Sequence, residues 1–173
     1  MRRIVTGAGA DGRSLVVIDG GAANMVAADE AGLAEIWMAA LDPARLLDCE
    51  DRLANGDVAL EPGKGAIKIR WFTVPVEDKN ASRENLEAQA AFAFAAVNAA
   101  HCRVDTTRHP MMHTTDTLDF IILVKGEVDL LLDKDEVKSL KPGDVVVQRA
   151  TNHAWINRGA ETALLVAILM NAG

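Results

Sequence analysis

The last third of the chain alternates between short apolar segments and turn signals. The apolar segments predict strands near 119–124, 127–132, 136–140, 144–148, 153–157 and 162–170. Gly126, Pro142-Gly143 and Asn157-Arg158-Gly159 separate these segments, and such residues favour turns. Short strands at this spacing predict an all-β sandwich or barrel.

The N-terminal segment has the pattern of a β-hairpin. Ile4–Thr6 and 14–18 are runs rich in β-branched residues, and residues 7–12 between them fit the pattern G-x-G-x-x-G. A dinucleotide-binding loop of that pattern needs a helix to begin directly after it. The run that follows predicts a strand instead, so we expect residues 7–12 to form a turn that binds no nucleotide.

The middle of the chain is less uniform. Residues 33–41 combine helix-favouring Ala, Leu and Met with a length that also suits a strand, whereas residues 42–62 are polar, contain Pro and Gly, and predict a loop. Residues 68–74 alternate polar and apolar side chains, which predicts a half-buried strand.

One helix is predicted over residues 82–100. Ser82 is suited to cap its first turn, acidic residues follow in that turn, and alanines dominate the rest. The apolar stripe expected to face the core consists of Leu86, Ala90, Ala93 and Val97, with Phe94 at its flank.

Composition narrows the classes of function. The 173 residues are half hydrophobic and carry a formal net charge of −7, with no basic stripe, which argues against nucleic acid as a partner. No apolar run is long enough to span a bilayer, so no membrane partner is expected. The two cysteines, Cys49 and Cys102, lack the spacing of a metal site or a disulfide framework, which favours a reducing cytoplasmic location.

The residues that could form a functional site lie before and after the predicted strand 119–124. His109, His113, Thr115, Thr117 and Asp119 all have odd numbers, so they share one face if the segment is extended. His153 and Trp155 would enter from a neighbouring strand. Two or three imidazoles and one carboxylate around one point would suit Fe(II) or Zn²⁺.

These residues resemble the two sequence motifs of the cupin superfamily. The first motif, G(x)5HxH(x)3,4E(x)6G, aligns through Gly126 and places His113 and Thr115 at its histidine positions and Asp119 at its glutamate. The second motif, G(x)5PxG(x)2H(x)3N, opens at Gly143 and closes at His153 and Asn157. In this motif, Gln148 and Ala150 replace Pro and Gly, and the interval that follows Gly143 is one residue short.

The resemblance implies an all-β cupin-type double-stranded β-helix, or jelly roll, with an N-terminal β extension and one α-helix. It favours a strand over residues 33–41, because cupin relatives carry an extended segment with a Trp there. Residues 1–100 would supply the extension, loop and helix, and residues 101–173 the barrel core.

The resemblance also implies a site inside the barrel. His113, Asp119 and His153 would hold a divalent metal such as Fe, Zn, Mn or Ni, with His109 as a fourth ligand or an acid/base. Thr115 in place of a ligand histidine and the shorter Asp119 are also changes that accompany loss of metal, so the metal-free alternative stays open.

Further residues complete the predicted pocket, and most have a structural alternative. Thr115, Thr117, Gln148 and Trp155 would line it, although Trp155 is also suited to packing in the barrel. Arg149 would clamp a carboxylate or lie in solvent at the rim. His101, at the end of the helix, is expected at the surface.

Two classes of function fit these features. One is a metal-assisted enzyme that acts on a small organic substrate by oxygenation, isomerisation or decarboxylation, with an oxidoreductase favoured because the chain resembles cupin-domain oxidoreductases of fungal polyketide pathways. The other is a binding module that holds a small molecule without turnover. A homodimer is also expected, because exposed strand edges and the N-terminal hairpin need a covering partner.

Overall fold

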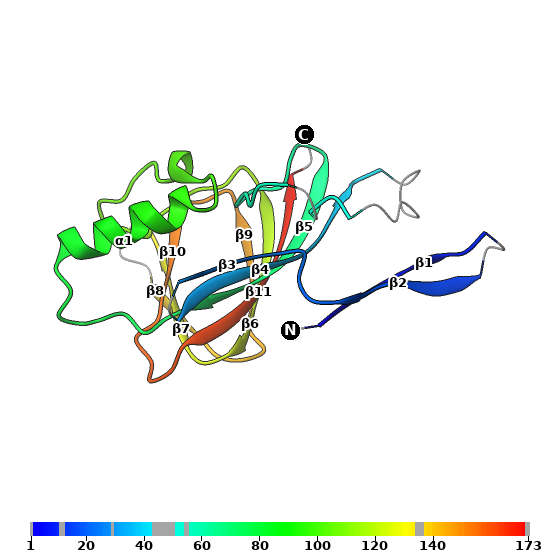
Figure 1. Ribbon diagram of the computed structural model, residues 1–173. Coiled ribbons are helices and arrows are strands. Elements are labelled where there is room, and N and C mark those ends of the chain that lie inside the picture. The colour runs from blue at the N-terminus through cyan, green and yellow to red at the C-terminus, as the bar shows by residue number, and fades with distance from the viewer. Residues whose placement is uncertain are drawn as a thin grey trace.

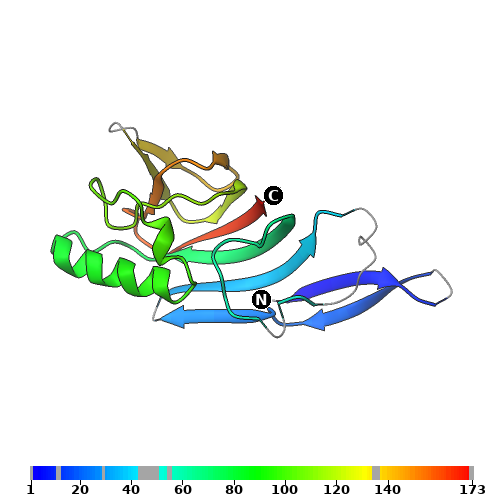
Figure 2. The ribbon, with the colours of Figure 1, turned by 90° about the horizontal axis from the view of Figure 1, so that it is seen from above.

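The computed structural model describes residues 2–10, 13–28, 30–42, 51–53, 56–133 and 137–171. Strands β1 (Arg3–Ala8) and β2 (Ser14–Gly20) form a hairpin that projects away from the body (Figures 1 and 2). The remaining strands form a six-stranded and a three-stranded antiparallel sheet. Cys49 lies outside the described residues.

The larger sheet has the strand order β3-β4-β5-β11-β6-β9. Its members are β3 (Asn24–Ala28), β4 (Ala31–Ala40), β5 (Ala66–Val74), β6 (Leu118–Lys125), β9 (Val145–Arg149) and β11 (Ala163–Asn171). The smaller sheet has the order β10-β7-β8 and contains β7 (Val128–Leu132), β8 (Val137–Leu140) and β10 (His153–Ile156). The larger sheet thus takes strands from both sides of residue 100.

The main apolar core lies between these two sheets. Leu123 and Leu165 contribute from the larger sheet, and Val128, Leu130 and Trp155 from the smaller one. All five side chains are buried, because alternate residues of each strand face the opposite sheet. The predicted all-β double-stranded β-helix with one helix is confirmed, as are the strands predicted over 33–41 and from 119 onward.

The turn residues named from the sequence have the expected backbone. Gly126 joins β6 to β7 with φ +82°, and a Cβ there would lie 2.9 Å from the Cα of Ala163. Gly143, between β8 and β9, has φ +96°. Glycine is the residue that adopts this left-handed conformation without steric cost, so both positions fix where neighbouring strands turn.

Helix α1 (Arg83–Ala95) packs along one side of the barrel (Figures 1 and 2). Ser82 caps it by accepting a hydrogen bond from the Asn85 backbone N–H, as predicted. The predicted extent to residue 100 was wrong, because Asn98 has φ +52° and ends the helical path before a 3-10 turn at Ala100–Cys102.

The buried face of α1 differs from the predicted stripe. Phe94 and Val97 are buried together with Ala90, whereas Ala93 is exposed. Phe94 therefore lies at the centre of the contact face and not at its flank. Its ring reaches the candidate site described below.

The described part of the chain contains no helix with the length and hydropathy of a membrane span.

Candidate functional site

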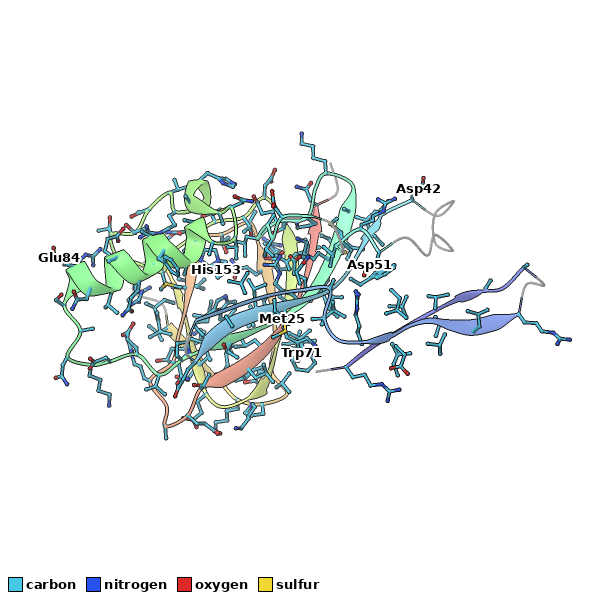
Figure 3. All side chains as sticks on the ribbon, in the orientation of Figure 1. Met25, Asp42, Asp51, Trp71, Glu84 and His153 are labelled. Atoms are coloured by element: carbon cyan, nitrogen blue, oxygen red, sulfur yellow. The ribbon has the colours of Figure 1, made fainter. Side chains whose placement is uncertain are left out.

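Two histidines predicted from the motifs lie side by side at one end of the barrel. His113 and His153 form an antiparallel bridge in which each backbone N–H donates to the other residue's carbonyl, at 2.9 and 3.0 Å. Directly opposed residues project to the same face of a sheet, so the two rings meet with centroids 4.3 Å apart. Figure 3 labels His153, which lies on β10.

Both imidazoles are anchored through the same ring nitrogen. Nδ1 of His113 lies 3.0 Å from the Met111 carbonyl, and Nδ1 of His153 lies 2.9 Å from the Thr151 carbonyl. A carbonyl only accepts, so each Nδ1 must carry the proton and each Nε2 keeps a lone pair in the neutral ring. The pair therefore presents two unprotonated nitrogens.

Burial keeps the two rings neutral. The pKa of His113 is lowered by desolvation, and desolvation together with the neighbouring His113 lowers the pKa of His153 to about 3. Phe94 from α1 covers His113 with ring centroids 4.8 Å apart, and Trp155 meets His153 edge-on at 5.3 Å. Trp155 is part of the apolar core, which is the packing role considered for it from the sequence.

The segment that precedes β6 buries its odd-numbered side chains. Thr115, Thr117 and Asp119 are buried while Asp116 and Leu118 are exposed, although the regular strand begins only at Leu118. The Thr117 hydroxyl donates to that of Thr115 at 2.8 Å, and Thr115 donates to Oδ2 of Asp119 at 3.4 Å.

Asp119 is a buried carboxyl group with incomplete hydrogen bonding. Its Oδ1 has no hydrogen-bond partner. Desolvation raises its pKa to about 6 against the opposing hydrogen bonds of Thr117 and Thr115. A carboxyl group with a pKa in this range exchanges protons near neutral pH, which is a property of catalytic acids and bases.

A second set of charged side chains is buried in the same interior. These residues were not predicted from the sequence as part of the site. Strand pairing places Lys68, Leu169, Asp119 and Gln148 in one row across β5, β11, β6 and β9. The next row toward the apolar core contains Arg70. The alternation over 68–74 was visible, but the buried face of this strand is its polar one.

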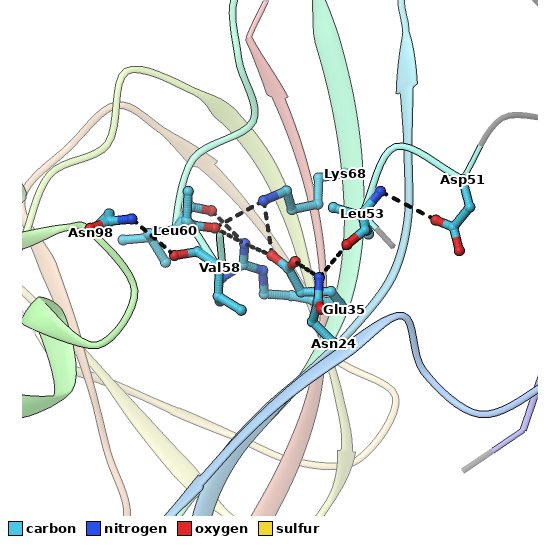
Figure 4. Close-up of polar contacts among 10 residues, drawn as sticks. Asn24, Glu35, Asp51, Leu53, Val58, Leu60, Lys68 and Asn98 are labelled. Atoms are coloured by element: carbon cyan, nitrogen blue, oxygen red, sulfur yellow. Dashed lines mark hydrogen bonds and ion pairs between the residues drawn. The ribbon is translucent and has the colours of Figure 1, made fainter. Parts of the chain in front are cut away.

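Glu35 on β4 holds these cations. Its Oε1 accepts from Nζ of Lys68 at 2.9 Å and from Nη2 of Arg70 at 3.1 Å, and all three side chains are at most 3% exposed (Figure 4). Nη2 of Arg70 also donates to the Leu60 carbonyl at 2.7 Å. Nε and Nη1 of Arg70 have no hydrogen-bond partner, so the guanidinium, like Asp119, has unused hydrogen-bonding capacity.

Arg70 and Asp119 act on each other electrostatically across β11. Burial lowers the pKa of Arg70 to about 10, so it remains cationic at neutral pH, while the charges of Glu35 and Asp119 oppose that shift. The cation also favours the ionised form of Asp119. The polar end of the interior thus contains a cation, a proton-exchanging carboxyl group and two neutral imidazoles.

His109, Arg149 and Gln148, which were also predicted to belong to the site, have other environments. His109 is buried and lies 2.7 Å from Glu77, while its Nδ1 accepts from the Met111 backbone N–H. Arg149 is exposed at the end of β9. Gln148 is buried and donates to the Thr151 carbonyl and hydroxyl.

The structure explains two residues of the second motif, one that differs from the cupin pattern and one that matches it. Ala150 occupies a position with φ +48°, the left-handed region that favours glycine, which explains why the motif has Gly there. Asn157 is fully buried, donates to the carbonyls of Val74 and Glu161, and accepts from the Gly159 N–H. Its role is to fix the turn before β11.

A third cluster lies where the 3-10 turn meets the loop before β5. Nε2 of His101 is 3.0 Å from Oε2 of Glu61 and 3.5 Å from Sγ of Cys102, and Sγ lies 3.8 Å from the same Oε2. This set of oxygen, nitrogen and sulfur donors could hold a metal ion. His101 is exposed as predicted, but the cluster itself was missed because no local spacing connects residue 61 to residues 101–102.

The donor atoms predicted from the cupin motifs are not as close to one another as those of this cluster. Among the described residues, the three donors that all lie within 4.8 Å of one another are those of Glu61, His101 and Cys102. Asp119 does not bring an oxygen that close to both imidazoles, and Thr115 supplies only a hydroxyl. A metal held by His113, Asp119 and His153 is therefore a poor fit, and it remains an untested sequence prediction.

Several known proteins share a local stretch of sequence with this chain. "Phomopsin biosynthesis cluster protein D" of Diaporthe leptostromiformis is 52% identical over 48 residues, which are 28% of this chain and 25% of that protein. "Cupin-domain-containing oxidoreductase srdD" of Neurospora crassa is 46% identical over 46 residues, 27% of this chain and 24% of that protein. The match thus spans about a quarter of the length of each relative. No family model matches the chain.

Solved structures overlap with the fold more broadly but at low identity. A Cupin 2 conserved barrel domain protein from Salinispora arenicola aligns over 87% of this chain and 83% of its own, with 13% identity and a TM-score of 0.43. An RmlC-like cupin from Methanocaldococcus jannaschii aligns over 59% and 67%, with 14% identity and a TM-score of 0.38.

The two facing sheets form a cupin-type barrel, in which the motif residue His113 is bridged to His153 on β10. Over 46 residues the chain is also similar in sequence to proteins named as cupin-domain-containing oxidoreductases.

Proposed function

We propose that the chain is a small-molecule enzyme that catalyses proton transfer at the polar end of the barrel interior. Asp119 is the proton acceptor and donor, and Arg70 binds an anionic group of the substrate. The observation that carries this proposal is that both residues are almost fully buried and yet retain polar atoms without a partner. A bound small organic acid would satisfy these atoms.

The proposed step needs no group beyond the side chains described. Asp119 takes a proton from a carbon next to a carbonyl group, and the bonding pair moves toward the carbonyl oxygen. The proton returns at the same or another carbon, so the step is an exchange or an isomerisation. The lowered pKa values of His113 and His153 keep both rings neutral at neutral pH, and their Nε2 atoms accept hydrogen bonds from substrate hydroxyl groups.

Solvent deuterium exchange tests this step. With 2-oxobutyrate as the probe in D₂O, the protein should accelerate deuterium incorporation at the carbon next to the carbonyl, as followed by NMR. Asp119→Asn should abolish the acceleration, and Asp144→Asn, an exposed carboxylate in the turn before β9, should retain it. An exchange rate equal to the protein-free rate, or one unchanged by Asp119→Asn, would contradict the proposal.

The binding-module alternative has an observation in its favour. Thr115 donates a hydrogen bond to Asp119 and accepts one from Thr117, so part of the predicted ligand set is engaged within the protein. In that case 2-oxobutyrate should shift the ring signals of His113 and His153 saturably without any exchange. The oxidoreductase names of the fungal relatives belong to proteins that this chain matches over a quarter of their length, so the proposal rests on the side chains of the site.

We also propose a homodimer with the N-terminal hairpin at the contact. Ile4 and Val16 are more than half exposed on the projecting arm, and an isolated two-stranded hairpin is marginally stable in water. Light scattering should give twice the 18.5 kDa chain mass at micromolar concentration. Deletion of residues 1–20 should shift this mass toward the monomer, and a monomer in the full chain would refute the proposal.

A further inference from the structure

The cluster of Glu61, His101 and Cys102 lies outside the site proposed above and has the geometry of a coordination shell. Ligands about 2.0–2.3 Å from a tetrahedral Zn²⁺ are separated from one another by roughly 3.3–3.6 Å. The three separations in the cluster are 3.0 Å between Glu61 and His101, 3.5 Å between His101 and Cys102, and 3.8 Å between Cys102 and Glu61. They match one face of such a tetrahedron to within a few tenths of an ångström.

The backbone holds two of the three donors in place. The second carboxylate oxygen of Glu61 accepts the Asp116 N–H at 2.7 Å. Cys102 is fixed in the 3-10 turn, where its N–H donates to the Ala99 carbonyl at 2.9 Å and its own carbonyl accepts from Thr114 at 2.9 Å. These two donors are thus preorganised before an ion arrives, which reduces the ordering cost of binding.

The cluster is not arranged for nucleophilic catalysis. A Cys–His–Glu relay needs the thiol at one imidazole nitrogen and the carboxylate at the other. Here both groups approach the same atom, Nε2 of His101. A shared nitrogen cannot pass a proton along such a relay, whereas a cation between the three donors satisfies all of them.

We propose that Glu61, His101 and Cys102 form a binding site for a zinc-class divalent cation with one coordination position open. Mixed sulfur, nitrogen and oxygen donors suit Zn²⁺ and Co²⁺ better than Mg²⁺ or Ca²⁺, which prefer oxygen alone. Cys102 is buried while the side chain of His101 is 68% exposed, so the ion enters and keeps its open position on the solvent side.

The bound ion stabilises the segment that leads into the barrel. Glu61 and Cys102 hydrogen-bond to Asp116 and Thr114, the residues on either side of Thr115. A cation that draws the two ligands together therefore also fixes the backbone from which Thr115 faces the polar interior.

Cobalt titration of the full chain under reducing conditions tests the site. Co²⁺ added to chelator-treated protein should bind at one equivalent and produce a near-ultraviolet thiolate-to-cobalt charge-transfer band, which Zn²⁺ then removes. Cys102→Ser should abolish the band. His101→Ala and Glu61→Gln should each weaken Co²⁺ affinity by at least about tenfold.

Two controls separate this site from other donors in the chain. Cys49→Ser removes the other cysteine, and His113→Ala disrupts the interior pair, and both variants should keep the band and its stoichiometry. Circular dichroism of each variant establishes that it is folded, and Glu61→Gln tests the site without altering the buried thiol. Absence of the band in the unmodified chain, its persistence in Cys102→Ser or its loss in Cys49→Ser would overturn the proposal.

Discussion

The interior cluster of His113, His153 and Asp119 and the outer cluster of Glu61, His101 and Cys102 use similar residue types in opposite environments. The interior side chains are at most 9% exposed, and desolvation is the first cause of each of their pKa shifts. In the outer cluster the imidazole is open to solvent and contacts a carboxylate. Burial therefore adapts the first cluster for controlled protonation, and accessibility adapts the second for taking up an ion.

The interior cluster depends on a buried ion network that the outer cluster lacks. Glu35→Gln should lower the free energy of unfolding by about 3–5 kcal/mol, because it leaves Lys68 and Arg70 buried without their counter-ion. Urea denaturation measures this loss. Glu61→Gln is the matched control and should cost less than about 1 kcal/mol, since its ion pair is with an exposed histidine. Equal losses in the two variants would contradict the distinction.

The interior groups should make stability depend on pH with opposite signs. The lowered pKa of His153 means that the unfolded chain takes up a proton as pH falls below about 6.5 while the folded chain resists until about 3. Stability is therefore lost on acidification, by about 1.4 kcal/mol per pH unit for each such proton. The raised pKa of Asp119 acts the other way, since its contribution is present below about 4 and is lost as pH rises toward 6.

Denaturation at a series of pH values between about 4.5 and 7 separates these contributions. His153→Gln should flatten the loss of stability on acidification, whereas Asp119→Asn should steepen it. A steeper slope in His153→Gln would show that the sign assigned to this histidine is wrong.

Desolvation is the first cause of the lowered pKa of His113, and it can be tested by reducing the packing over the His113 ring. Phe94→Leu removes ring atoms that pack against His113 and should cost about 1–2 kcal/mol of stability. Water near the imidazole should raise its pKa toward the ordinary value, as measured by NMR titration of the ring protons. Phe92→Leu on the exposed side of α1 is the control and should leave the pKa of His113 where it is.

The smallest effect is expected at the outer histidine. In the presence of chelator, His101→Ala should change the free energy of unfolding by less than about 0.5 kcal/mol, because an exposed ion pair contributes little. Thermal or urea denaturation measures this change. A loss above about 2 kcal/mol in metal-free protein would mean that the outer cluster is a structural element in its own right and would remove the contrast with the interior.

The sequence by itself determined the strands, the turns and the adjacency of two histidines. Gly126 and Gly143 marked turns because only glycine is unstrained at their φ values, and alternation along 113–119 predicted which side chains are buried. The second-motif spacing placed His153 on the strand that bridges to His113. These properties are local, and they follow from backbone sterics and the two-residue period of extended chain.

Only the tertiary structure decided which charges are buried and which donors meet. The alternation of Lys68 and Arg70 identified a strand but not its buried face, because that depends on Glu35 from β4 compensating both cations. Glu61 reaches His101 and Cys102 across 40 positions of sequence, where chain folding and not spacing sets the distance. The electrostatic contact between Arg70 and Asp119 across β11 likewise depends on strand pairing, which no motif spacing indicated.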